Sequence, residues 1–174
     1  MKRDFSLWQL AGFGFTTLAG TLLHFLYDWT GQTTWSALIS GVNESTWEHM
    51  KLLYVPLFLF AALQFFFFRE YENFWCIKLI GTICGLSLIP VLFYTYNGAV
   101  GPSPDWLNIT IFFVSAAAAF YLEWLLFQAN RPRRCRPILS FWLLIAIGIL
   151  FIVFTFAPPR IPLFQDPIAG TYGI

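Results

Sequence analysis

Charged side chains are scarce in this chain. Asp, Glu, Lys and Arg make up 11% of its 174 residues, whereas an ordinary soluble domain carries roughly 25%. The net charge is only +1, so the basic surface that nucleic-acid-binding proteins need is missing. Hydrophobic residues make up 58%, which excludes a disordered chain. A soluble protein of this size cannot remove so much apolar surface from water, and we therefore predict an integral membrane protein whose main contacts are lipids.

Cysteine is also rare. The three cysteines, Cys76, Cys84 and Cys135, are too few for a secreted disulfide framework. Cys84 falls within an apolar stretch, and the other two lie near basic segments that we assign to the cytoplasm below. We therefore expect Cys76 and Cys135 to be reduced.

Long apolar stretches are abundant. Five of them approach the roughly 20 residues that a helix needs to cross a bilayer. We place these spans at about 7–27, 52–68, 75–96, 106–128 and 138–157. A further stretch at about 33–42 carries apolar side chains at helical spacing on one face, which favours a short helix lying in the membrane interface. No repeat or linker divides residues 1–174, so we predict one polytopic all-α domain: a five-helix transmembrane bundle with one interfacial helix.

The basic residues predict the orientation of this bundle. They gather before the first span, on either side of the connection after the second span, and in the connection after the fourth span: Lys2, Arg3, Arg69, Lys78, Arg131, Arg133, Arg134 and Arg136. Cytoplasmic loops are enriched in Lys and Arg, so we predict a cytoplasmic N-terminus and, after five crossings, a C-terminus outside. Residues 158–174 contain four prolines and many apolar residues, and we expect this tail to be ordered and to pack over the outer face.

Small residues predict which helices pack together. Gly81 and Gly85 form a G-x-x-x-G step in the third span, and residues 115–119 of the fourth span are all Ser or Ala. Small side chains let helix backbones approach closely in a membrane, so we expect these two spans to be in contact. Glu123 lies near the inner end of the fourth span, and we expect its carboxylate to extend toward the arginine-rich connection.

Polar residues with metal-binding chemistry gather at the predicted outer side. His24 and Asp28 share one face at the end of the first span, and Glu44, Glu48 and His49 surround the start of the second. Imidazole and carboxylate ligands suit zinc, iron or manganese. We predict a divalent-metal site with His24, Glu48 and His49 as ligands. Glu44 or Asp28 would be a further ligand, an anchor or the base that deprotonates a metal-bound water.

A purely structural interpretation of the same residues is also open. Ser45 and Glu48 match the capping box S-x-x-E, in which the glutamate only returns a hydrogen bond to the start of the helix. His24 would then pair with Asp28 or a free carbonyl, and His49 would lie among lipid headgroups.

Three strings of the sequence resemble those of a known family. They are residues 24–29 (HFLYDW), residues 43–51 (NESTWEHMK) and the tail from Pro162 to Ile174. They look like those of a family of small bacterial multi-pass membrane proteins catalogued as a domain of unknown function. The resemblance implies a bacterial inner-membrane protein and no activity. A looser likeness connects the chain to ceramidase-type membrane hydrolases, which use seven spans and three zinc-binding His, whereas only His24 and His49 exist here.

These observations leave three functions open. The first is an accessory protein in which the polar cluster locks helix ends together. The second is a metal-dependent membrane hydrolase acting on a lipid or amphiphile at the outer face. The third is an ion or small-solute transporter, which five spans without a repeat support only if two copies of the chain associate. Candidate partners are thus membrane lipids, an amphiphilic ligand and a second copy of the chain.

Overall fold

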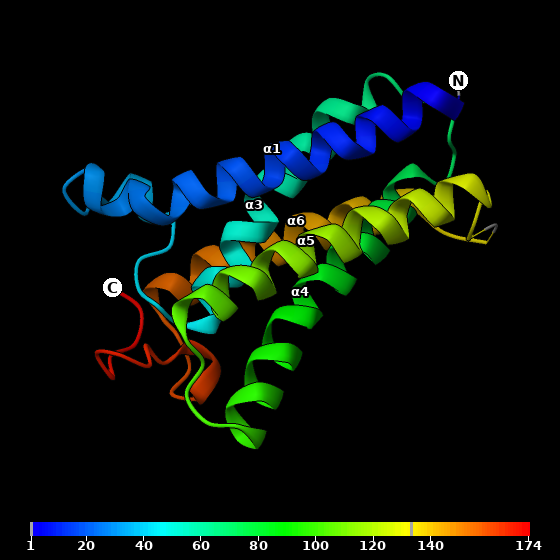
Figure 1. Cartoon of the computed structure of the whole chain (residues 1–174). Helices are drawn as coiled ribbons and strands as arrows, with labels where there is room; N and C mark the ends of the chain where they lie inside the picture. Colours follow the sequence, from blue (N-terminus) through cyan, green and yellow to red (C-terminus); the bar gives the residue numbers. More distant parts are fainter. Residues whose placement is uncertain (1, 133) are drawn as a thin grey trace.

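The computed structural model of the chain is all-α (Figure 1). It describes residues 2–132 and 134–174, with side chains from Phe5 onward, so Arg133 and the side chains of Lys2 and Arg3 lie outside the described residues. The long helices are α1 (Lys2–Trp29), α3 (Thr46–Phe65), α4 (Phe74–Ala99), α5 (Asp105–Gln128) and α6 (Pro137–Phe156). A short helix α2 (Thr34–Ala37) and a 3-10 turn η1 (Pro162–Phe164) complete the described elements.

Each of the five predicted apolar stretches coincides with a long helix. By length and composition, α1, α4, α5 and α6 can each cross a membrane. The chain is therefore a multi-pass membrane protein. Helix α3 is not in that group because its first turns carry Glu48, His49 and Lys51.

The close contact between the third and fourth predicted spans is confirmed, because α4 and α5 share the most extensive helix–helix interface. Gly85 makes it possible, since a Cβ there would lie 3.0 Å from the Cβ of Ala119 and 3.1 Å from the carbonyl oxygen of Ser115. Helix α3 is the central helix and contacts α1, α4, α5 and α6. Its buried residues Leu53, Leu57 and Phe60 lie in the main hydrophobic core.

The helix ends form two opposite groups (Figure 1). The basic end contains the N-terminus, the α3–α4 connection and the α5–α6 connection. There the rings of Phe5 from α1, Tyr71 from the α3–α4 connection and Phe127 from α5 contact one another. The tail end contains the C-terminus of α1, the N-terminus of α3 and the C-terminal tail. There Phe164 packs on Trp47 with ring centroids 4.8 Å apart, and the Asn43 amide donates to the Gly173 carbonyl at 3.0 Å. The tail is thus folded back onto the bundle.

The interfacial segment is less helical than predicted. The expected helix at about 33–42 is only the single turn of α2. The hydroxyls of Ser36 and Ser40 donate to the backbone carbonyls of Thr33 and Ser36 at 2.8 and 2.6 Å. Serines that hydrogen-bond nearby backbone in this way favour turns over continued helix. Trp35 remains exposed, as expected for a segment at the surface of the bundle.

Two expectations about the basic end are wrong. Cys76 and Cys135 are not free thiols but form a disulfide, because the α5–α6 connection folds back onto the first turn of α4 and brings their Cα atoms to 6.3 Å. Glu123 does not extend toward the arginines. Its carboxylate is fully buried and binds Lys78, which is itself buried within α4.

Candidate metal centre

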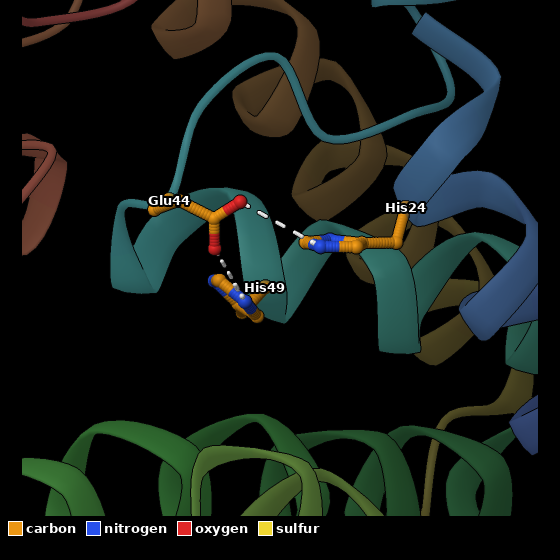
Figure 2. A group of neighbouring side chains, drawn as sticks. All are labelled: His24, Glu44 and His49. Atoms are coloured by element: carbon orange, nitrogen blue, oxygen red, sulfur yellow. Dashed lines mark ion pairs between the residues drawn. The ribbon is translucent and has the colours of Figure 1, made fainter. Parts of the chain in front are cut away.

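Three side chains with metal-binding atoms meet at the tail end (Figure 2). His24 comes from the last third of α1, and His49 from the first turn of α3. Glu44 precedes the N-cap residue Ser45, whose extended backbone starts the helix and whose hydroxyl accepts from the Glu48 N–H at 3.3 Å. Because Glu44 lies before the cap, its side chain is not constrained to the helix face and can reach both imidazoles.

The distances fit ligands around one small cation. Glu44 Oε1 lies 3.6 Å from His24 Nε2, and Glu44 Oε2 lies 3.5 Å from His49 Nε2. One ligand atom from each residue falls within 4.8 Å of the others. Two ligands that bind one tetrahedral ion through bonds of about 2.1 Å lie about 3.4 Å apart, so little movement is needed. The side chains are partly exposed, at 31% for His24, 42% for Glu44 and 27% for His49, which leaves the centre open on one side.

A backbone contact orients one of the imidazoles. His49 Nδ1 lies 3.0 Å from the carbonyl oxygen of Ser45. A carbonyl only accepts, so Nδ1 of this ring carries a proton, and Nε2 is the nitrogen that faces the Glu44 carboxylate. A close approach of Nε2 to a carboxylate oxygen is favourable when a proton or a metal cation lies between the two atoms. A histidine that donates one nitrogen to a carbonyl and binds a metal through the other is a common arrangement in metal sites.

The C-terminal tail holds Glu44 in position. Asp166 Oδ2 accepts from the Glu44 N–H at 3.2 Å, and its Oδ1 accepts from Ile168 and Ala169 at 2.7 and 2.9 Å. Burial alone would raise the pKa of Asp166, but these three N–H donors and the charge of His49 hold its pKa below the usual value. We did not single out Asp166 from the sequence. The only sequence signal was its place in a tail expected to fold over the residues around Glu44.

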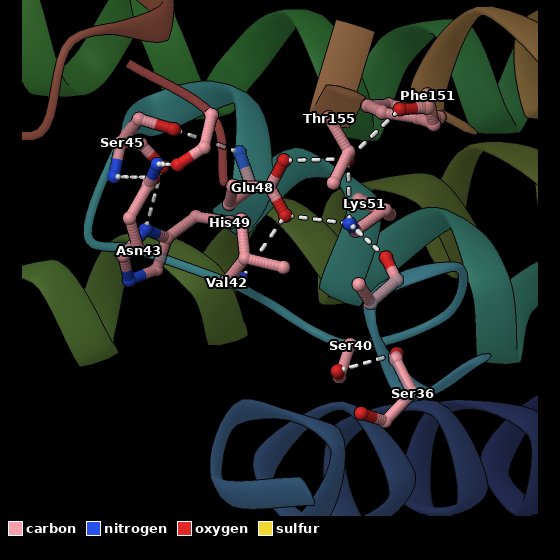
Figure 3. A network of polar contacts seen from close by, with 12 residues as sticks. Ser36, Ser40, Val42, Asn43, Ser45, Glu48, His49, Lys51, Phe151 and Thr155 are labelled. Atoms are coloured by element: carbon pink, nitrogen blue, oxygen red, sulfur yellow. Dashed lines mark hydrogen bonds and ion pairs between the residues drawn. The ribbon is translucent and has the colours of Figure 1, made fainter. Parts of the chain in front are cut away.

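Glu48, a predicted ligand, faces away from the imidazoles and into the bundle (Figure 3). Its carboxylate binds Lys51 at 2.6 Å and accepts from the Thr155 hydroxyl at 2.8 Å and from the Val42 N–H at 3.2 Å. Lys51 in turn donates to the Ala37 carbonyl at 2.9 Å. This buried network joins α2, α3 and α6 directly behind the three-residue cluster.

The capping-box interpretation is confirmed only in part. Ser45 caps α3, but the Glu48 side chain does not return the bond. The Ser45 N–H donates instead to Asn43 Oδ1 at 3.0 Å. Asp28, predicted as a base or further ligand, is not one of the three clustered residues. It is exposed one turn beyond His24, where Gln32 donates to its Oδ1 at 3.4 Å.

The comparisons with known proteins identify the family and nothing further. The model described as "Family of unknown function (DUF6512)" matches residues 1–174, so the chain belongs to that family. No curated protein and no solved structure matches the chain.

Proposed function

We propose that this member of the DUF6512 family is a five-span protein of the bacterial inner membrane that binds one divalent transition metal through His24, Glu44 and His49. The single observation that carries the proposal is the meeting of two imidazoles and one carboxylate from three separate segments at ligand distances. Glu44 replaces Glu48 as the carboxylate ligand, because both oxygens of Glu48 are already bound by other groups.

In this proposal α3 is the fifth crossing. Its 20 residues give a helix about 30 Å long, which matches the hydrocarbon thickness. The charges that lower its hydropathy are buried and neutralise each other, since Lys51 and Glu48 form an ion pair with side chains 0% and 2% exposed. The proposal assigns the basic end to the cytoplasm and the candidate metal centre to the outside because of the distribution of Lys and Arg. The Cys76–Cys135 disulfide at the basic end is the observation that opposes this orientation.

The three ligand residues limit which metal ions the site can bind. Two histidines and one carboxylate occur in catalytic zinc sites and in non-haem iron(II) sites, and both kinds keep at least one position open for water or substrate. Manganese is the third candidate, because carboxylate oxygen suits it well. The partial exposure of all three side chains fits such an open position.

A metal-dependent hydrolase acting on a lipid or amphiphile is the second candidate function. The observation in its favour is that Asp28 is exposed one turn from His24 and makes one long hydrogen bond, so this carboxylate is free to accept a proton from a metal-bound water. Under this proposal Asp28→Asn abolishes hydrolysis of a lipid substrate while the metal remains bound.

Metal analysis of the detergent-purified protein tests the main proposal. We expect about one zinc, iron or manganese ion per chain, and loss of that metal in His24→Ala, Glu44→Gln and His49→Ala. The matched control is Glu72→Gln, which changes an exposed carboxylate at the basic end and should leave the metal content unaltered. A parent protein without stoichiometric metal after loading with each ion in turn would refute the proposal. So would a Glu44→Gln protein with unchanged metal content.

A further inference from the structure

A second set of polar side chains lies inside the bundle, away from the candidate metal centre. Gln9, Gln64, Lys78 and Glu123 come from four different helices, and each is at most 4% exposed. The packing around Gly12 shows that three of them lie at a similar depth along the bundle. A Cβ at Gly12 would lie 2.6 Å from the Phe60 ring and 2.5 Å from the Phe120 ring, so α1, α3 and α5 meet there. Gln9, Gln64 and Glu123 each lie one helical turn from this contact, toward the basic end. We call these four residues the buried polar layer.

An ion pair lies at the centre of the buried polar layer. Lys78 Nζ binds Glu123 Oε2 at 2.5 Å, and the Gln9 amide donates to the same oxygen at 3.3 Å. The ammonium also lies within 6.0 Å of the ring centroids of Phe74, Phe120 and Phe127. Ionisable residues at membrane depth are costly, and they mark proton or ion pathways in membrane proteins more often than elsewhere.

The layer has hydrogen-bonding capacity that no described residue uses. Glu123 Oε1, Gln9 Oε1 and both amide atoms of Gln64 are buried without a partner. A buried polar atom without a hydrogen-bond partner is costly, so internal water is expected here. Gly81 lets the Glu123 side chain lie directly against the backbone of α4, because a Cβ there would lie 2.7 Å from Glu123 Oε1.

Further unpartnered hydroxyls extend from the layer toward the tail end. Thr82 lies one turn beyond Lys78 on α4, and Ser115 lies two turns before Glu123 on α5. Thr16 lies two turns beyond Gln9 on α1. All three side chains are fully buried, and none of their oxygens has a partner among the described residues. Beyond them lies the buried network of Glu48, Lys51 and Thr155.

We propose that Glu123 is a proton-binding group and that the buried polar layer passes protons along the bundle interior through water and the hydroxyls of Thr82, Ser115 and Thr16. A hydronium ion transfers its proton to Glu123 Oε1, forming an O–H bond and leaving water. The neutral acid then releases the proton to a water on the other side, which restores the carboxylate. Among the described residues, Lys78 from α4 is the charged group in contact with Glu123, and α1 contributes the neutral amide of Gln9.

Proton flux into proteoliposomes tests this proposal. The vesicles contain a pH-sensitive dye, and a potassium diffusion potential with valinomycin drives the protons. We expect flux above that of empty vesicles, loss to the empty-vesicle level in Glu123→Gln and partial retention in Glu123→Asp. Glu72→Gln, which changes an exposed carboxylate at the basic end, is the matched control and should conduct normally.

A second pair of variants separates conduction from a structural role. Ser115→Ala and Thr82→Val each remove an unpartnered buried hydroxyl. If these groups were only part of the packing, their removal would leave both thermal stability and flux unchanged or raise stability. A proton path predicts a folded protein with reduced flux. Wild-type flux equal to that of empty vesicles, or full flux in Glu123→Gln or in both hydroxyl variants, overturns the proposal, as does sodium uptake without proton uptake.

Discussion

Substitution of Gly81 by alanine tests the packing of the buried ion pair. A Cβ at position 81 would lie 2.4 Å from Glu123 Cγ, 2.7 Å from Oε1 and 2.9 Å from Cδ. Carbon atoms in van der Waals contact are about 3.5–4.0 Å apart, so the glutamate must move. It is surrounded by protein on α1, α4 and α5, and the shift therefore pulls its carboxylate away from Lys78.

The expected cost follows from two opposing effects. Breaking a buried ion pair so that one charge is left alone costs about 3–5 kcal/mol. Alanine in place of glycine within a helix returns about 1 kcal/mol through its higher helix propensity. We therefore expect Gly81→Ala to lower the free energy of unfolding by about 2–4 kcal/mol, the difference between these two figures.

Thermal or denaturant unfolding in detergent, followed by tryptophan fluorescence, measures this change. Gly14→Ala is the matched control, because nothing lies within 4 Å of a Cβ there, and it should be neutral or stabilising. In a Lys78→Met/Glu123→Ala background the clashing atoms and both charges are gone, so Gly81→Ala should cost little. If Gly81→Ala lowered the free energy of unfolding equally in both backgrounds, or raised it in the wild-type background, the clash would not be with Glu123.

Two other predictions concern the two ends of the molecule. Asp166 has a lowered pKa in the folded protein, so its contribution to stability is complete above the unfolded-state pKa of about 3.9 and is lost as the pH falls through the folded value. The melting temperature should thus fall in acid, and by less in Asp166→Asn; parallel curves for the two proteins would contradict this. The proposed orientation is tested in intact cells of a Cys84→Ser background with a membrane-impermeant maleimide. Ile168→Cys in the exposed tail should react at once, whereas Cys76 and Cys135 should react only after reduction in opened cells. The reverse pattern would place the basic end outside, in the oxidising compartment where disulfides usually persist.

Much of the fold follows from the sequence, because each long helix is a long apolar run of its own. The contact of α4 with α5 was also predictable, since Gly81, Gly85 and the Ser/Ala run are local signals for close packing. The site was predictable as a set of residues, because few polar groups interrupt an apolar chain and they gather at one end. His24, Glu44 and His49 were all in that set.

The roles within the set were not predictable. Glu44 and Glu48 are equivalent in residue type, and the sequence analysis named Glu48 as a ligand and Glu44 as a further ligand, an anchor or a base. In the structure Glu44, not Glu48, lies beside the imidazoles. Helix α3 begins after Ser45, so Glu44 precedes the helix and can reach both histidines, whereas Glu48 lies within it and contacts Lys51 and Thr155. That choice depends on the C-terminal tail, where Asp166 holds the backbone of Glu44.

The sequence alone determined that the chain is helical and embedded in a membrane, because apolar length and scarce charge are properties of the residues themselves. The tertiary structure decided which distant groups meet: Lys78 with Glu123, Cys76 with Cys135, and Glu44 with two histidines. These pairings depend on how each helix is rotated about its axis when it packs. That rotation is set by the fit of side chains between helices, which no single stretch of the sequence contains.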